Sequence, residues 1–313
     1  MENKIIVITG QTATGKTELA LSIAKKEDGE IVNFDARQIY RYLDIISGKD
    51  LPNEDSFHHK EKLNNFDIGY YSYPQAPLWL YDIVEPNIDF SSFDYQKIAL
   101  AVIHGILSRG KVPILVGGSY FYLYHLLYEL SAESHPANWN LREELNKLAV
   151  EDLQARLKKI SPKTLEGMNR SDRQNPRRLI RRIEILSQKT IPLTHTHSAK
   201  VVLGQKLGID TLNLEIIGIS HKDINQIKAR IEKRVDKRIK AGAYNEVEGL
   251  IKKGYTLEDH GLKTIGYTQV YKYLKGELTE EAAIAEWIIR EIQYAKRQLT
   301  FMKKDTNIVW RNV

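Results

Sequence analysis

Residues 10–17, GQTATGKT, directly follow the apolar run IIVIT at residues 5–9. This stretch fits the pattern G-x-x-x-x-G-K-[ST] in its required setting, after an expected strand and before an expected helix. In such a loop the backbone N–H groups and the start of the helix bind an anion, and the lysine adds a positive charge. The threonine hydroxyl is placed to hold Mg²⁺. The stretch therefore predicts a site for a diphosphate or triphosphate, formed by Gly10, Gln11, Thr12, Ala13, Thr14, Gly15, Lys16 and Thr17.

The segments around this loop alternate between strand and helix patterns. Apolar runs at residues 4–10, 30–35 and 112–118 predict strands, and residues 17–27 and 97–111 have helical spacing. Such alternation predicts an α/β domain with a largely parallel sheet, in the manner of a P-loop NTPase-like core. Residues 213–220 predict a further strand of this sheet, followed by long helices.

The alternation stops in the middle of the chain. Charged helical patterns such as NLREELNKLAVEDLQARLKKI, residues 140–160, take over between residues 131 and 208. We therefore expect a catalytic core of residues 1–130 and 209–313 and an all-helical insertion of residues 131–208. Residues 53–77 show neither pattern consistently and are expected to be a long loop.

Composition limits the class of protein. The chain has 313 residues, a net charge of +6 and no cysteine, which excludes disulfides, thiolate metal sites and cysteine nucleophiles. The stretch before Gly10 is too short for a signal peptide, and no apolar run is long enough to span a membrane. We therefore expect a cytoplasmic protein with no membrane partner.

Asp35 ends the second expected strand, in NFDARQIY at residues 33–40. In an open α/β sheet ligands bind beyond the carboxyl ends of the strands, so Asp35 is expected near the phosphates. It can serve there as a metal-linked carboxylate, as a general base or as the N-cap of a following helix. Arg37, Gln38 and Arg41 add hydrogen-bond donors beside it.

The third expected strand ends in two glycines and Ser119 rather than in an acid, which weakens a hydrolytic interpretation. Gly117 and Gly118 allow a ligand to approach the backbone closely, and the Ser119 hydroxyl can donate to a phosphate or a base. A tight turn without any ligand remains the alternative.

Basic side chains gather in NRSDRQNPRRLIRR, residues 169–182, with only Asp172 and Glu184 nearby. Like charges four residues apart on a helix repel one another, so an anionic partner is the natural compensation, and nucleic-acid contact is favoured over a solvated surface. Residues 227–242 form a second basic segment. In KTIGYTQ, residues 263–269, Tyr267 either stacks on a base or packs.

Together these segments make the sequence similar to the tRNA dimethylallyltransferases, also called tRNA isopentenyltransferases. The resemblance implies transfer of a dimethylallyl group from its diphosphate to N6 of the adenosine 3′ of the anticodon, position 37, with release of diphosphate. The matching stretches follow the family order and span residues 5 to about 301: GQTATGKT, FDARQIYRYLDI, DIVEP, VPILVGGSYFYL, DRQNPRRLIRRIEIL, ARIEKRVDKRI, TIGYTQVYKYLKGE and YAKRQLTF.

The resemblance also implies roles for single residues. Asp35 would be the general base, Ser119 would assist it, and Lys16 and Thr17 would complete the catalytic group, with Thr17 helping to bind Mg²⁺. Residues 10–17 and Arg230 would hold the diphosphate. The chain would contact the tRNA anticodon stem-loop through Asp35, Ala36, Arg37, Gln38, Arg177, Arg178, Leu179, Ile180, Arg181, Lys263, Thr264, Ile265, Gly266, Tyr267 and Thr268. Residues 131–208 would thus be a tRNA-binding insertion. Separately, we expect the chain to be a monomer.

The sequence departs from the family pattern at several positions. Ala36, Ser119 and Phe301 stand where the family has serine, threonine and tryptophan. Leu78 and Trp79 replace two histidines, Glu291 and Ile292 replace a threonine and an arginine, and the excursion between Lys49 and Pro77 is long.

Three other functions use the same features. Transfer of a dimethylallyl group to a free adenine nucleotide needs the loop and the acid but no arginine-rich insertion. A small-molecule kinase would use the loop to transfer phosphate from ATP without RNA affinity. An RNA-binding protein with a degenerate loop would bind tRNA without turnover, although Lys16, Thr17 and Asp35 are intact.

Overall fold

The computed structural model describes residues 3–52, 56–63, 66–128, 137–187, 198–221 and 223–312. The chain divides into two compact units, the first made of Met1–Leu127 with Ser198–Val313 and the second of Tyr128–His197. The sequence placed residues 198–208 in the insertion, but α9 (Ala199–Leu207) belongs to the first unit because its buried apolar side chains pack against α3 and β7.

The first unit is built on one sheet with the strand order β3-β4-β5-β2-β6-β1-β7-β8. All neighbouring strands are parallel except the pairs β3–β4 and β4–β5. The expected α/β fold with a largely parallel sheet is therefore confirmed. The strands are β1 (Asn3–Gly10), β2 (Gly29–Asn33), β3 (Phe57–Leu63), β4 (Phe66–Tyr71), β5 (Leu78–Trp79), β6 (Val112–Val116), β7 (Leu212–Ser220) and β8 (Val309–Asn312).

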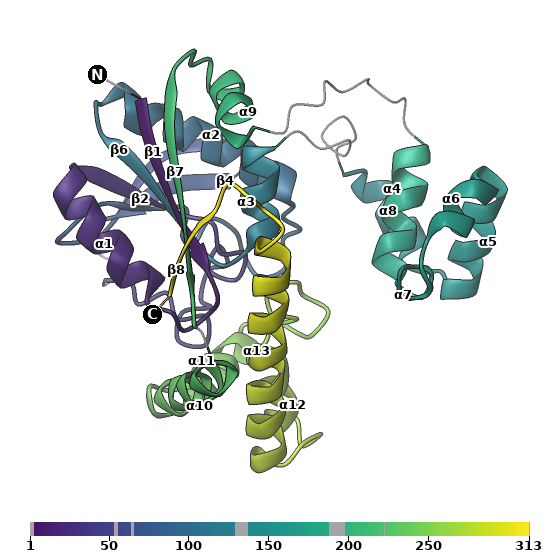
Figure 1. Cartoon of the computed structure of the whole chain (residues 1–313). Coiled ribbons are helices and arrows are strands. Elements are labelled where there is room, and N and C mark those ends of the chain that lie inside the picture. Colours follow the sequence, from purple (N-terminus) through teal and green to yellow (C-terminus); the bar gives the residue numbers. More distant parts are fainter. Residues whose placement is uncertain are drawn as a thin grey trace. The chain divides into compact units, whose positions relative to one another are not determined.

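Helices cover the sheet because its central strands are apolar on both faces, as parallel strands usually are. Ile6 and Ile8 of β1 pack against Ala20 and Ala24 of α1. Figure 1 shows a second group of helices, α10 to α13, gathered at one end of the sheet. The helices of this unit other than α9 are α1 (Lys16–Glu27), α2 (Ser92–Ser108), α3 (Tyr120–Leu127), α10 (Ile224–Lys240), α11 (Ala243–Lys252), α12 (Tyr267–Leu274) and α13 (Glu280–Met302).

The expected long loop at residues 53–77 is wrong in part, because it contains the antiparallel pair β3–β4. The interior of β3 is exposed along its length, so its sequence FHHKEKL shows no alternation of apolar and polar residues. An edge strand of this kind leaves little trace in the sequence.

No helix within the described residues combines the length and apolar character needed to span a membrane.

The second unit is helical and has its own apolar core. Leu145, Leu153, Leu157, Leu179 and Ile183 are fully buried in it. Its helices are α4 (Trp139–Leu145), α5 (Val150–Ile160), α6 (Pro162–Gly167), α7 (Arg170–Arg173) and α8 (Pro176–Leu186).

One buried carboxylate ties α8 to the start of α4. Glu184 is fully buried and accepts hydrogen bonds from Arg142 Nη2 at 2.8 Å, from Arg181 and from the backbone N–H of Asn138 at 2.6 Å. Burial alone would raise the pKa of Glu184, but the hydrogen bonds from Arg142 and Arg181 lower it below its ordinary value.

We expect Glu184→Gln to lower the free energy of unfolding by about 2–3 kcal/mol, because two partly buried guanidinium groups lose their counter-charge. The stabilising effect of Glu184 is present above its ordinary pKa and is lost as pH falls through the lowered one. Calorimetric unfolding from pH 7 downward measures both. The exposed pair Lys147–Glu143 provides the control, since Glu143→Gln should stay within about 0.5 kcal/mol of the parent chain; equal effects of the two changes would refute this role of Glu184.

Candidate active site

The loop between β1 and α1 is folded so that its N–H groups converge. Ala13 and Gly15 have φ values of 61° and 81°, and no side chain caps the first N–H groups of α1. A Cβ at Gly10 would lie 2.1 Å from the carbonyl oxygen of Ile219, so only glycine fits there. Successive N–H groups in such a conformation form an anion-binding hollow.

Lys16 supplies a cation to this hollow, and its Nζ donates to the carbonyl oxygen of Gln11 at 2.6 Å. Burial of the ammonium group, assisted by Arg234 and Arg37 and opposed by Asp35, lowers the pKa of Lys16 to about 7. An anion bound beside Lys16 favours the protonated form. Binding of an anion above neutral pH is therefore coupled to uptake of a proton.

A cavity of about 280 Å³ opens above the loop. Of the residues expected to be catalytic, Lys16, Thr17 and Asp35 line it. We call it the phosphate cavity.

Arg230 and Arg234, one helical turn apart on α10, differ in their relation to the phosphate cavity. Arg230 is exposed, and its Nη1 lies 3.5 Å from the carbonyl oxygen of Ala13, outside the lining of the phosphate cavity. Arg234 lines the cavity and donates from Nη1 to Thr12 Oγ1. Sequence reasoning did not place Arg234 at this cavity, although the helical spacing of the two residues was visible. The role of Arg230 stays a prediction.

Asp35 lies in a turn directly after β2. Its Oδ1 accepts the N–H of Arg37 at 3.0 Å, and no helix follows it, so the N-cap alternative does not apply. Ser119 Oγ accepts the N–H of Ala36 at 2.8 Å and thereby holds the turn, without itself lining the phosphate cavity. Asp35 Oδ2 accepts no hydrogen bond from the described residues. This oxygen is available to a proton donor in the cavity.

A buried ion cluster formed by Arg37, Arg234, Arg238 and Glu291 adjoins the cavity, and Arg37 and Arg234 also line it. Arg37 Nη1 donates to Glu291 Oε1 at 2.9 Å, and Arg238 Nη1 lies 3.7 Å from the same oxygen. Arg37 Nε is 3.7 Å from Asp35 Oδ1. The cluster thus contains more positive than negative groups, and it connects Glu291, a departure from the family pattern, to the expected base.

The pKa values in the cluster follow from burial and this imbalance. Burial would raise the pKa of Glu291, but Arg37, Arg238 and Arg234 lower it below its ordinary value. Burial, together with Arg234, lowers the pKa of Arg238 to about 9 in spite of Glu291. Arg37 Nε, Arg238 Nη1 and Glu291 Oε2 are buried without a hydrogen-bond partner in the described part of the chain. Such a cluster stabilises an anion nearby.

Helix α13 fixes the loops of the site with one buried face. Gln298 Oε1 accepts the N–H of Thr12 at 2.9 Å, and its Nε2 donates to the carbonyl oxygen of Gly118 at 2.9 Å. A Cβ at Gly118 would lie 2.4 Å from Gln298 Nε2, so a larger residue there would displace this amide. Sequence reasoning missed Gln298 and the role of Glu291. The available signal was their spacing with the buried Ala295 and Met302 on one helix face.

In the stretch KTIGYTQ, the Tyr267 ring is buried and does not face solvent, where a base could stack on it. Tyr267 is 1% exposed, and its hydroxyl donates to Glu246 Oε1 at 2.7 Å. Glu246 Oε2 accepts the N–H groups of Asp44 and Ile45 at 2.8 and 2.6 Å. The Tyr267 ring therefore packs. Within the same stretch Lys263 is exposed, Thr264, Ile265 and Thr268 are partly exposed, and Gly266 is buried with a φ of 91°.

In the second unit the expected RNA-contacting residues divide into core and surface. Leu179 and Ile180 are buried, so their side chains pack inside the unit. Arg177 and Arg178 are exposed, Arg178 pairs with Asp172, and Arg181 pairs with Glu184. Within residues 137–187, no acidic side chain pairs with Arg170, Arg177 or Arg182.

Comparisons with known sequences place the chain in a family. A family model described as IPP transferase matches residues 38–305, and one described as isopentenyl transferase matches residues 3–68. A tRNA dimethylallyltransferase of Acetivibrio thermocellus is 35% identical over 317 aligned residues, which cover 100% of this chain and 92% of that protein. A tRNA dimethylallyltransferase 2 of Geotalea uraniireducens is 35% identical, with 98% of this chain and 91% of that protein covered.

Solved structures agree with this relationship. The full-length tRNA isopentenylpyrophosphate transferase of Bacillus halodurans has a TM-score of 0.66 at 29% identity, over 99% of this chain and 90% of that one. A eukaryotic dimethylallyltransferase acting on tRNA shares the fold, with a TM-score of 0.72 at 21% identity over 99% and 74% of the two chains. The chain belongs to the tRNA dimethylallyltransferase family.

We expect binding of inorganic pyrophosphate to take up a proton at pH 8 and to take up less than half as much at pH 6, where Lys16 is already protonated. Affinity should accordingly fall as pH rises above 7. Isothermal titration calorimetry in two buffers with different ionisation enthalpies measures this uptake. Lys16→Met should remove the share that belongs to Lys16 and leave only the proton exchange of pyrophosphate itself; an uptake equal to that of the parent chain would contradict the assignment.

We expect Glu291→Gln to lower the free energy of unfolding by about 3 kcal/mol. Among the described residues, Glu291 is the buried carboxylate that pairs with Arg37 and Arg238, and the change removes its charge. Bound pyrophosphate replaces part of the lost charge, so it should raise Tm more in Glu291→Gln than in the parent chain. Calorimetry with and without pyrophosphate measures the two shifts. Glu248→Gln, which changes an exposed pair with Lys252, is the matched control; identical pyrophosphate shifts in Glu291→Gln and the control would argue against electrostatic coupling.

Proposed function

We propose that this chain transfers the dimethylallyl group of dimethylallyl diphosphate to N6 of the adenosine 3′ of the tRNA anticodon, position 37, and releases diphosphate. The observation that carries the proposal is one cavity of about 280 Å³ in which the phosphate loop and Lys16 adjoin Asp35. Family membership supports the reaction class.

The chemistry needs a stabilised leaving group and a base. The bond between the allylic C1 and the diphosphate oxygen breaks, a bond from N6 to C1 forms, and the N6 proton passes to Asp35 Oδ2. Negative charge grows on the departing diphosphate, where the loop N–H groups, Lys16 and Arg234 are already in position. Preorganised donors of this kind usually contribute the largest part of the rate enhancement.

Thr17 is the residue that fits a Mg²⁺ ion, because its exposed side chain lines the phosphate cavity. The described residues contain no group of three acidic or histidine side chains arranged for a metal. Mg²⁺ is commonly held by few protein groups together with substrate phosphates and water, so this donor set suits it. When bound, the ion would add positive charge beside the diphosphate.

The arginines of α8 support tRNA over a free nucleotide as the acceptor. Arg177 and Arg182 have exposed charges that a mononucleotide does not require, whereas phosphates of an RNA stem would neutralise them. The acceptor adenine must leave its stack to reach Asp35, which costs a few kcal/mol and requires such a grip on the surrounding RNA. We place this reaction in the cytoplasm and expect the chain to act as a monomer.

Asp35→Asn keeps the turn, since its amide oxygen still accepts the N–H of Arg37, but it cannot take the N6 proton. We expect the single-turnover rate to fall by about 10²-fold or more. The dissociation constant for tRNA should change by less than about twofold. Quench-flow with labelled donor and filter binding measure the two quantities. A parent-like rate would remove Asp35 from the mechanism.

Arg177→Ala should weaken tRNA binding and reduce the slope of log K against log salt by about one, as expected for one lost phosphate contact. Arg156→Ala is the control, because Arg156 lies on α5 and pairs with Glu144. Binding titrations between 50 and 300 mM salt provide the slopes. If both variants keep the parent slope, α8 is an ordinary solvated surface.

A further inference from the structure

A second cavity, of about 650 Å³, adjoins the phosphate cavity, and Gly48, Asp50 and Arg234 line both. Phe57 and Tyr71, from the β3–β4 hairpin, form part of its wall. The proposed reaction leaves this space unexplained, because Lys16 and Asp35 line only the smaller cavity. We call it the hairpin cavity.

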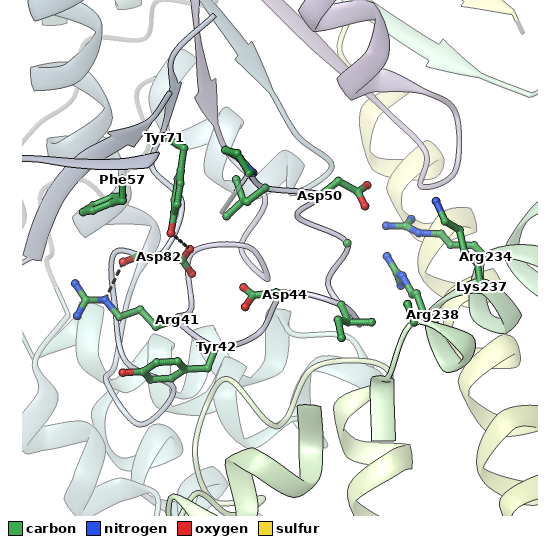
Figure 2. A pocket seen from close by; sticks show the side chains of 15 residues that line it. Arg41, Tyr42, Asp44, Asp50, Phe57, Tyr71, Asp82, Arg234, Lys237 and Arg238 are labelled. Atoms are coloured by element: carbon green, nitrogen blue, oxygen red, sulfur yellow. Dashed lines mark hydrogen bonds between the residues drawn. The ribbon is translucent and has the colours of Figure 1, made fainter. Parts of the chain in front are cut away.

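The walls of the hairpin cavity combine aromatic and charged groups. Figure 2 shows Tyr42, Phe57 and Tyr71 on one side and the cations of α10 on the other, with Asp44 and Asp50 between them. The cations are Arg234, Lys237 and Arg238. A purely apolar ligand would match only one side of this space.

The two rings of the hairpin are held in place. Phe57 and Tyr71 are opposite one another in the β3–β4 register, with ring centroids 5.0 Å apart. Tyr71 donates its hydroxyl proton to Asp82 Oδ2 at 2.6 Å, and Asp82 in turn pairs with the buried Lys49. A Cβ at Gly69 would lie 2.4 Å from Phe57 Cζ, so glycine makes room for this ring. The hairpin therefore presents a preformed aromatic wall.

The charged groups of the hairpin cavity favour a nucleotide over a hydrocarbon tail as its ligand. The exposed side chains of Asp50 and Lys237 line the cavity and have no hydrogen bond or ion pair with any residue that the structure describes. A prenyl tail would desolvate them without offering a partner. A nucleotide offers a ring face to Phe57 and Tyr71, amino groups to Asp50 and a phosphate to Lys237. Single-stranded RNA is recognised by this combination of stacking, base edges and cations.

We propose that the hairpin cavity binds one unstacked nucleotide of the RNA substrate, next to the acceptor adenosine. The ligand is a neighbour of the acceptor because Asp35, the base for the acceptor, does not line this cavity. The proposal rests on the proposed function in that it takes RNA as the substrate. It gives the β3–β4 hairpin, an excursion that the reaction chemistry does not require, a role in reading the sequence around the acceptor.

The test uses the full chain and an unmodified anticodon stem-loop RNA, with 2-aminopurine placed in turn at each nucleotide flanking the acceptor. Inorganic pyrophosphate replaces the donor, so no transfer takes place. With the parent chain, fluorescence at one flanking position should rise severalfold as that base leaves the RNA stack. Phe57→Ala and the milder Phe57→Leu should abolish the rise and weaken RNA binding about tenfold, as expected for one lost base-stacking contact.

His59→Ala is the matched control, because His59 lies on the same strand, is exposed and does not line the cavity. It should keep the parent fluorescence and affinity, and the KM for dimethylallyl diphosphate should be unchanged in all three variants. No fluorescence rise at any flanking position would overturn the proposal. So would a severalfold higher donor KM in Phe57→Leu with unchanged RNA affinity, which would assign the cavity to the prenyl group.

The outcomes separate this proposal from the proposed function. A parent chain that unstacks a flanking base but transfers no dimethylallyl group to RNA contradicts the function and supports the nucleotide site. A parent chain that modifies the RNA while every flanking base stays stacked supports the function and refutes the nucleotide site.

Discussion

The side chain of Gln298 joins the two loops on which the site depends. Its amide accepts the N–H of Thr12 in the phosphate loop and donates to the carbonyl oxygen of Gly118 after β6. About one turn earlier on α13, the carbonyl oxygen of Ala295 accepts a hydrogen bond from Gln11. About two turns earlier, Glu291 accepts one from Arg37 in the Asp35 turn. Loops that follow three different strands are thus hydrogen-bonded to one face of α13. The position of the phosphate loop relative to Asp35 depends on this helix face.

The same helix face carries the counter-charge for a site that is otherwise strongly positive. Arg37, Arg234 and Arg238 lie around Glu291, and Lys16 lines the adjoining phosphate cavity. Burying several cations near one carboxylate costs folding free energy, and a bound diphosphate offsets that cost. In the proposed reaction, the groups that would bind the diphosphate are therefore the same groups that repel one another in the protein without ligand. Glu291, where the family pattern has threonine, is the local means of limiting this repulsion.

The parts of the molecule that could be predicted are those encoded by short segments. The buried parallel strands are apolar runs, and the loop at residues 10–17 has a fixed spacing, so the α/β fold and the placement of Lys16, Thr17 and Asp35 around one cavity followed from the sequence. Pairing between distant residues left no such trace. Glu291 meets Arg37 across 254 positions, the exposed strand β3 lacks alternation, and burial of Tyr267 depends on Glu246 from another helix.

The most direct test of the central claim is incubation of the purified protein with dimethylallyl diphosphate, Mg²⁺ and unmodified tRNA, with AMP as acceptor in a parallel reaction. Nucleoside mass spectrometry of both products locates the new group. The account predicts N6-dimethylallyladenosine from the tRNA alone, at the adenosine 3′ of the anticodon. An adduct on AMP alone, or bound tRNA that stays unmodified, would contradict it.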